Sequence, residues 1–158
     1  MESALGPVDS PSAVLDTNVV LDWLVFRDTS TAPLVDAIEG CRLRWLACPR
    51  MRGELVRTLS YPSLASWNPD SEHVLTNFDR WSIACPTPAP SAANPACTDT
   101  DDQVFIDLAL AEGAQWLLTR DRALLKLARR MLVRGVHVVT PARWAAEEKN
   151  RAAEAAPD

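Results

Sequence analysis

Short apolar runs separated by amphipathic segments are the feature that most constrains the fold of this chain. The clearest run, residues 116–119, is apolar on both sides of the backbone, as expected of a strand covered on both faces. Other short runs predict strands at residues 13–15, 42–47, 83–85 and 136–139. Predicted helices separate these strands, two after each of the first two strands and one after each of the next two. This order predicts an α/β fold with a parallel sheet between helical layers.

The helix predictions rest on apolar spacing and on stop signals. Gly40, Gly113 and Gly135 each follow an apolar-periodic segment, where a glycine commonly ends a helix. Thr100 and Gln103 fit a capping box at the start of one helix. Residues 61–69 and the proline-rich residues 86–98 are predicted loops. The predicted helices cover residues 18–26, 31–39, 49–59, 71–81, 100–112, 121–132 and 141 to about 151.

Length and composition limit the class of protein. A chain of 158 residues is enough for one domain, and no apolar run approaches the ~18 residues of a membrane span. The first residues show no export signal, so we expect a cytoplasmic protein. The four cysteines form no C-x-x-C pair and are interpreted as small buried hydrophobes. The predicted parts are a disordered leader (1–12), one domain (13–144) and a helix end with a tail (145–158).

Several acids lie where a parallel sheet places its functional crevice, beyond the carboxyl ends of the strands. Asp16 ends the first predicted strand, and Asp121 lies two residues beyond the 116–119 strand. Asp99, Asp101 and Asp102 crowd one helix start. Each acid also has a structural interpretation: Asp121 as a helix N-cap, the three clustered acids as partners of the helix dipole.

Glu54 lies at the border of its predicted helix, between an apolar stripe and a side that carries Arg50 and Arg57. Its structural alternative is an exposed ion pair with either arginine, worth about 0.5 kcal/mol. Taken together, acids at two strand ends and two helices suggest one site for hard Mg²⁺ or Mn²⁺, which carboxylate oxygens bind without His or Cys.

Net charge does not argue against a polyanionic substrate. The chain carries 21 acids and 16 bases, for a net charge of −5. Setting five candidate site acids aside leaves 16 acids and 16 bases, so the rest of the protein is neutral. Fourteen of the bases are arginine, whose planar fork suits phosphate, although genome composition bias would give the same count.

Four acidic motifs carry a resemblance to a known family. They are 14–19 (VLDTNV), Glu54 in a proline-led helix, 99–102 (DTDD) before 105–109 (FIDLA), and 118–125 (LTRDRALL). In this order and spacing they resemble the PIN-domain ribonucleases over residues 13–144. The greatest similarity is to the group described as toxin components of toxin–antitoxin pairs.

The resemblance implies a three-layer α/β/α fold, phosphodiester hydrolysis and an acidic quartet. By position, the quartet is Asp16, Glu54, Asp102 and Asp121. Asp102 is preferred to Asp101 because it stands seven residues before Ala109, but the doublet leaves both open. Residues that could orient a carboxylate or a metal-bound water are Thr17, Asn18, Asp101 and Thr119.

The resulting functional hypothesis is an endoribonuclease for single-stranded RNA that uses Mg²⁺ or Mn²⁺. Its expected partners are RNA and a protein antitoxin, with a homodimer considered and no membrane. Trp23, near Asp16, is the one tryptophan considered for RNA contact. The alternative is a PIN-like domain that binds RNA or protein without cutting. Phosphate contacts are proposed for Arg50, Arg57, Arg120 and Arg122, with solvated surface as their alternative.

Other enzyme classes fit less well. Haloacid-dehalogenase-type phosphatases require a second Asp two residues after the first, where this chain has Asn18. Receiver domains need an early Asp pair and a strand-end lysine, which are missing, and no glycine-rich phosphate loop is present. His73 and His137 fall at positions that do not suit a general base.

Overall fold

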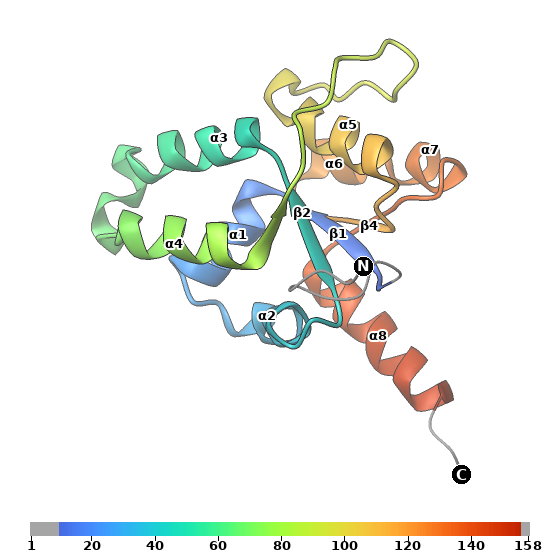
Figure 1. Cartoon of the computed structure of the whole chain (residues 1–158), viewed down its shortest axis with the longest axis horizontal. Coiled ribbons are helices and arrows are strands. Elements are labelled where there is room, and N and C mark those ends of the chain that lie inside the picture. Colours follow the sequence, from blue (N-terminus) through green and yellow to red (C-terminus); the bar gives the residue numbers. More distant parts are fainter. Residues whose placement is uncertain (1–9, 156–158) are drawn as a thin grey trace.

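The protein forms a single parallel sheet flanked by helices (Figure 1). The structure is a computed structural model, and it describes residues 10–155. The strand order is β3-β2-β1-β4-β5, and every neighbouring pair is parallel. The strands are β1 (Ser12–Leu15), β2 (Arg44–Ala47), β3 (Ser82–Ala84), β4 (Trp116–Leu118) and β5 (His137–Val139). The helices are α1 (Thr17–Leu24), α2 (Ala32–Glu39), α3 (Pro49–Leu59), α4 (Ser71–Trp81), α5 (Gln103–Glu112), α6 (Arg122–Leu125), α7 (Ala128–Val133) and α8 (Pro141–Ala155).

The central strand β1 shows why these apolar runs form a sheet. Val14 lies opposite Leu46 on one side and Leu117 on the other, and all four β1 residues are buried. A strand paired on both edges and covered on both faces has no place for a solvated side chain, so it is apolar without alternation. Each of these short runs is therefore a strand because its neighbours satisfy its backbone while the helices cover its side chains.

The order of the strands places the helices in two layers. The chain moves outward from β1 to β2 and β3, then returns past β1 to β4 and β5. Right-handed crossovers therefore put α1 to α4 on one face and α5 to α7 on the other. Figure 1 shows the sheet running between α3 and α4 on one side and α5 and α7 on the other. The predicted three-layer α/β/α fold is confirmed.

One predicted helix start was wrong. Thr100 begins a short 3₁₀ turn, Thr100–Asp102, and the α-helix begins only at Gln103. The cap is Asp99, whose carboxylate accepts from the Asp101 amide at 3.0 Å. The Gln103 side chain instead accepts from the Cys97 amide at 2.8 Å, so no capping box forms. An aspartate carboxylate competes better than a threonine hydroxyl for a free helix amide, since it carries charge.

Other boundaries also differ from the prediction. The 121–132 helix divides into α6 and α7, because the Leu127 amide bonds the Leu124 carbonyl and tightens the chain into a turn. A 3₁₀ segment, Pro62–Trp67, lies within the predicted loop at 61–69. The first helix ends at Leu24, and α8 continues to Ala155. Ser12 belongs to β1, while residues 1–9 of the predicted leader lie outside the described residues.

Burial agrees with the cysteine prediction for three of the four cysteines, Cys48, Cys85 and Cys97, while Cys41 is partly buried. Within residues 10–155, no helix has the length and apolar character needed to cross a bilayer.

Candidate active site

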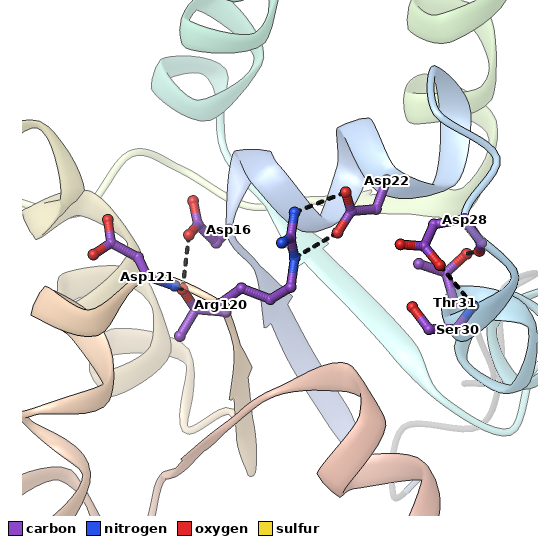
Figure 2. Close-up of polar contacts among 8 residues, drawn as sticks. Asp16, Asp22, Asp28, Ser30, Thr31, Arg120 and Asp121 are labelled. Carbon is purple, nitrogen blue, oxygen red and sulfur yellow. Dashed lines mark hydrogen bonds and ion pairs between the residues drawn. The ribbon is translucent and has the colours of Figure 1, made fainter.

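Two adjacent strands end at the candidate site and bring their polar residues together. Asp16 follows β1, Thr119 follows β4, and the Asp16 amide donates to the Leu118 carbonyl at 3.0 Å. The Thr119 hydroxyl donates to Asp16 Oδ2 at 2.7 Å and accepts from the Asp121 amide at 2.9 Å. Thr119 thereby links the two acids. Figure 2 shows the carboxylates of Asp16 and Asp121 pointing to the same side.

Asp16 is almost fully buried, with 3% of its surface exposed. Burial raises its pKa, and the negative charge of Asp121 raises it further. The Thr119 hydrogen bond and the amides of Thr17 and Asn18 act in the opposite direction and lower this pKa. Asp16 is therefore held in one orientation by neutral donors, the Thr119 hydroxyl and the amides of Thr17 and Asn18.

Glu54 reaches the same region from α3. Its Oε2 accepts from the Thr17 hydroxyl at 3.0 Å, which joins α3 to the start of α1. Burial raises the Glu54 pKa, and Asp16 adds to this effect. Arg57 lowers the pKa from the exposed side of α3. The structure thus gives Thr17 a contact with Glu54, while Asn18 lies exposed beside it.

Asp102 is the least compensated acid of the group. Its side chain is buried, and its Oδ2 has no hydrogen-bond partner within the described part of the chain. Burial raises the Asp102 pKa to about 8. A hydrogen bond between the Asp102 and Asp121 carboxyls, which needs a proton on Asp102, raises it further, as do the charges of Asp16, Asp99 and Asp121. The neighbouring Asp101 is exposed at the surface. Asp102 interacts with Asp16 and Asp121, whereas the charge of Asp101 raises the pKa of Glu54.

Asp121 occupies the position that sequence reasoning left open between an N-cap and a site acid. Its Oδ1 accepts from the Ala123 amide at 2.8 Å, so it caps α6. The same carboxylate influences the pKa of both Asp16 and Asp102. The N-cap interpretation is therefore confirmed, and the cap still leaves Asp121 within electrostatic reach of the other acids.

The four candidate arginines occupy different environments. Arg120 donates two hydrogen bonds to the buried Asp22 of α1, at 2.7 and 2.8 Å (Figure 2). Arg50 and Arg57 are exposed on α3, and Arg122 is exposed directly after Asp121. Trp23 packs against Trp45, with ring centroids 5.4 Å apart, and is partly buried. All four arginines are thus exposed, and of the four only Arg120 pairs with a carboxylate within residues 10–155.

Sequence reasoning missed one residue near the site, Asp22, and noted another, Asp99, without giving it a role. Asp22 lies in the apolar stretch of α1 and is buried with its neighbours, so a lone acid inside an apolar run was the available signal. Asp99 caps the 3₁₀ turn and raises the pKa of Asp102. Its spacing before the doublet was visible, but a cap and a site acid look alike in sequence.

The candidate acids have the donor atoms that a hard divalent cation binds, but their carboxylates are not close enough together to surround one. The donor set of Asp16, Glu54, Asp102 and Asp121 is entirely oxygen, which suits Mg²⁺ or Mn²⁺, and the unpartnered Oδ2 of Asp102 is an available ligand atom. Within residues 10–155, however, no three His, Cys, Asp or Glu side chains are arranged to hold an ion as they stand.

Comparison with known proteins gives one match. A family model described as PIN domain matches residues 12–123, a span that includes all four candidate acids. A search of curated proteins found no match. PIN domains are commonly metal-dependent nucleases. Because the model covers most of the chain and the fold has the expected three layers, the chain belongs to the PIN-domain family.

Proposed function

We propose that this protein is an endoribonuclease that hydrolyses single-stranded RNA with Mg²⁺ or Mn²⁺. The observation that carries the proposal is the buried, unpartnered Oδ2 of Asp102, among acids that raise its pKa. A buried carboxylate is costly unless a cation or a proton compensates it. A polyanionic substrate with its divalent ions would supply that cation.

The residues that would hold the metal are Asp16, Glu54, Asp102 and Asp121. Such an ion supplies an activated water and neutralises charge on the phosphate during hydrolysis. Thr119 fixes the Asp16 carboxylate, and Thr17 fixes that of Glu54. Because these two hydroxyls hold their carboxylates from the outset, less ordering is needed when substrate arrives.

The exposed arginines Arg50, Arg57 and Arg122 are suitable for phosphate contact near these acids. Arg120 keeps one nitrogen, Nη1, outside its two bonds to Asp22 and stays a predicted contact on that basis. The wider biological setting rests on the motif resemblance alone: a cytoplasmic toxin, neutralised by a protein antitoxin and capable of forming a homodimer.

The test is a cleavage assay with purified protein on labelled single-stranded RNA, in Mn²⁺, in Mg²⁺ and in chelator. We expect cleavage only with metal, and slower or no cleavage of duplex RNA and of DNA. Asp16→Asn should lower the rate at least 1,000-fold, equivalent to about 4 kcal/mol of barrier.

Asp36→Asn is the matched control, because Asp36 is an exposed acid on α2 and should leave the rate unchanged. Cleavage that survives in Asp16→Asn, in a preparation free of contaminating nuclease, would contradict the assignment. RNA binding by wild type without cleavage under any metal condition would favour the alternative of a binding module.

A further inference from the structure

Basic charge is concentrated on the segment that follows the candidate site. Residues 122–134 contain five basic residues and no acid, in a chain whose net charge is −5. This segment forms α6, a turn and α7, and α7 lies across the molecule from α3 and α4 in Figure 1. The basic residues are Arg122, Lys126, Arg129, Arg130 and Arg134.

All five basic residues are exposed, and three of them recur three or four residues apart along the segment. Leu124, Leu127 and Met131 are buried in the core and recur every three or four residues. Arg122, Lys126 and Arg129 are exposed and recur four and three residues apart, out of phase with that buried stripe. We call these three residues the basic stripe.

The stripe lacks the internal partners that other basic residues of this protein have. Arg52 and Arg120 each donate two hydrogen bonds to a carboxylate, and Arg143 pairs with Glu147. Within residues 10–155, no ion pair involves a residue of the stripe. The helix dipole favours bases at a C-terminal end, which explains Arg122 and Lys126 at the end of α6 and Arg130 and Arg134 at the end of α7, but not Arg129 at the start of α7.

We propose that the basic stripe binds the phosphate backbone of RNA as it leaves the candidate active site. This inference rests on the proposed function. The stripe begins at Arg122, directly after Asp121. An RNA strand bound at the candidate acids would therefore contact Arg122 first and then Lys126 and Arg129. Basic side chains without acidic partners, placed in a row, can bind successive phosphates of the RNA backbone. Such contacts do not depend on the nucleotide sequence. RNA is favoured over an acidic protein because the row starts at the site that would cut a polyanion.

The test is equilibrium binding of a fluorescent single-stranded RNA in chelator, which requires no cleavage. The double variant Lys126→Gln/Arg129→Gln removes two of the three charges at exposed positions. Each lost single-strand contact reduces the salt slope by about 0.7, so between 50 and 200 mM salt the wild type should lose about sevenfold more affinity than the variant. Lys126→Arg/Arg129→Lys keeps both charges and should retain the wild-type slope.

Arg42→Gln/Lys149→Gln is the control for net charge, because it removes two exposed charges beside α2 and α8. It should leave the slope unchanged. If the stripe variant behaves like this control, the stripe does not bind RNA. Unchanged RNA affinity together with lost affinity for polyglutamate would overturn the proposal and assign the stripe to an acidic protein. Absence of cleavage by wild type would contradict the proposed function but leave this binding result standing.

Discussion

Two buried aspartates, Asp22 and Asp102, show opposite solutions to the same problem. Burial raises the pKa of both. Asp22 receives two hydrogen bonds from Arg120, which lower its pKa in return. Asp102 has an oxygen without a partner, and burial, a hydrogen bond with Asp121 and the charges of neighbouring acids raise its pKa to about 8. The Asp22 carboxylate receives its hydrogen bonds from Arg120, whereas the Asp102 carboxylate requires a proton or a bound cation.

The presence or absence of a positive partner distinguishes a structural acid, Asp22, from a candidate site acid, Asp102. This distinction does not depend on the match to the PIN-domain family. The Asp22–Arg120 pair joins α1 to the turn after β4, two elements that carry Asp16 and Asp121. The pair therefore holds the frame in which the other acids repel one another. Acids that lie close together without a positive side chain, held in place by an ion pair beside them, are the arrangement expected of a cation site.

The largest expected effect distinguishes the two acids of the doublet. Asp102→Asn should reduce metal-dependent RNA cleavage at least 100-fold, because it removes a candidate ligand from the interior of the group. Asp101→Asn should change the rate less than tenfold, since Asp101 is exposed. Cleavage rates of both variants under saturating Mn²⁺ test this difference. Equal losses in the two variants would mean that burial does not identify the ligand.

Both variants should fold as the wild type does, which near-ultraviolet circular dichroism checks. The raised pKa of Asp102 favours its neutral form in the metal-free protein, and the neutral asparagine resembles that form. A loss of activity with an intact fold would therefore report on the site itself.

The sheet and part of the candidate site could be predicted from sequence because they depend on local patterns. Apolar runs identify buried strands, and acids after parallel strands meet at one edge whatever their separation in the chain. Asp16 and Asp121 were found in this way, although they are 105 positions apart in the sequence. The hydroxyl of Thr119 joins them because β1 and β4 are neighbours.

What sequence reasoning missed depends on contacts between distant residues or on competition between similar ones. Nothing in the sequence pairs Arg120 with Asp22, which is 98 residues away, so Arg120 was interpreted only as a phosphate contact. Asp99 rather than Thr100 caps the 3₁₀ turn, a choice that local backbone geometry decides. The turn between α6 and α7 contains neither glycine nor proline, so the pattern carried no stop signal there.

The next effect tests the Asp22–Arg120 pair. Arg120→Met leaves Asp22 buried without its donors, and we expect a loss of about 2 kcal/mol in the free energy of unfolding. This value takes the lower part of the range because the Arg120 side chain is 53% exposed and solvent weakens the pair. For a domain of this size the melting temperature should fall by about 4–8 °C.

The double variant Asp22→Leu/Arg120→Met should recover most of that stability, since the buried charge is then removed with its partner. Thermal unfolding in chelator measures both variants beside wild type. A melting temperature for Arg120→Met within 1 °C of wild type, by our criterion, would show that Asp22 does not depend on Arg120, and the contrast with Asp102 would fail.

The last effect is a pH dependence that tests the Asp102 side of the comparison. The folded pKa of Asp102 is about 8, above the ordinary value of 3.8, so between these values the folded protein binds the proton more tightly than the unfolded chain. The resulting stability is fully present below pH 3.8 and is lost as the pH rises toward 8. Asp16 and Glu54 shift in the same direction. One such proton contributes at most about 1.4 kcal/mol per pH unit.

Urea unfolding in chelator between pH 5.5 and 8 should therefore show wild type losing stability faster than Asp102→Asn, which has no proton to lose at this position. Mn²⁺ should flatten the wild-type slope, because a bound cation compensates the carboxylates after they ionise. At a hundredfold excess over its dissociation constant it should also add about 2.7 kcal/mol. Parallel slopes for wild type and Asp102→Asn would mean that the Asp102 proton does not control folding. A wild-type slope unaltered by Mn²⁺ would mean that the cation does not take the place of that proton.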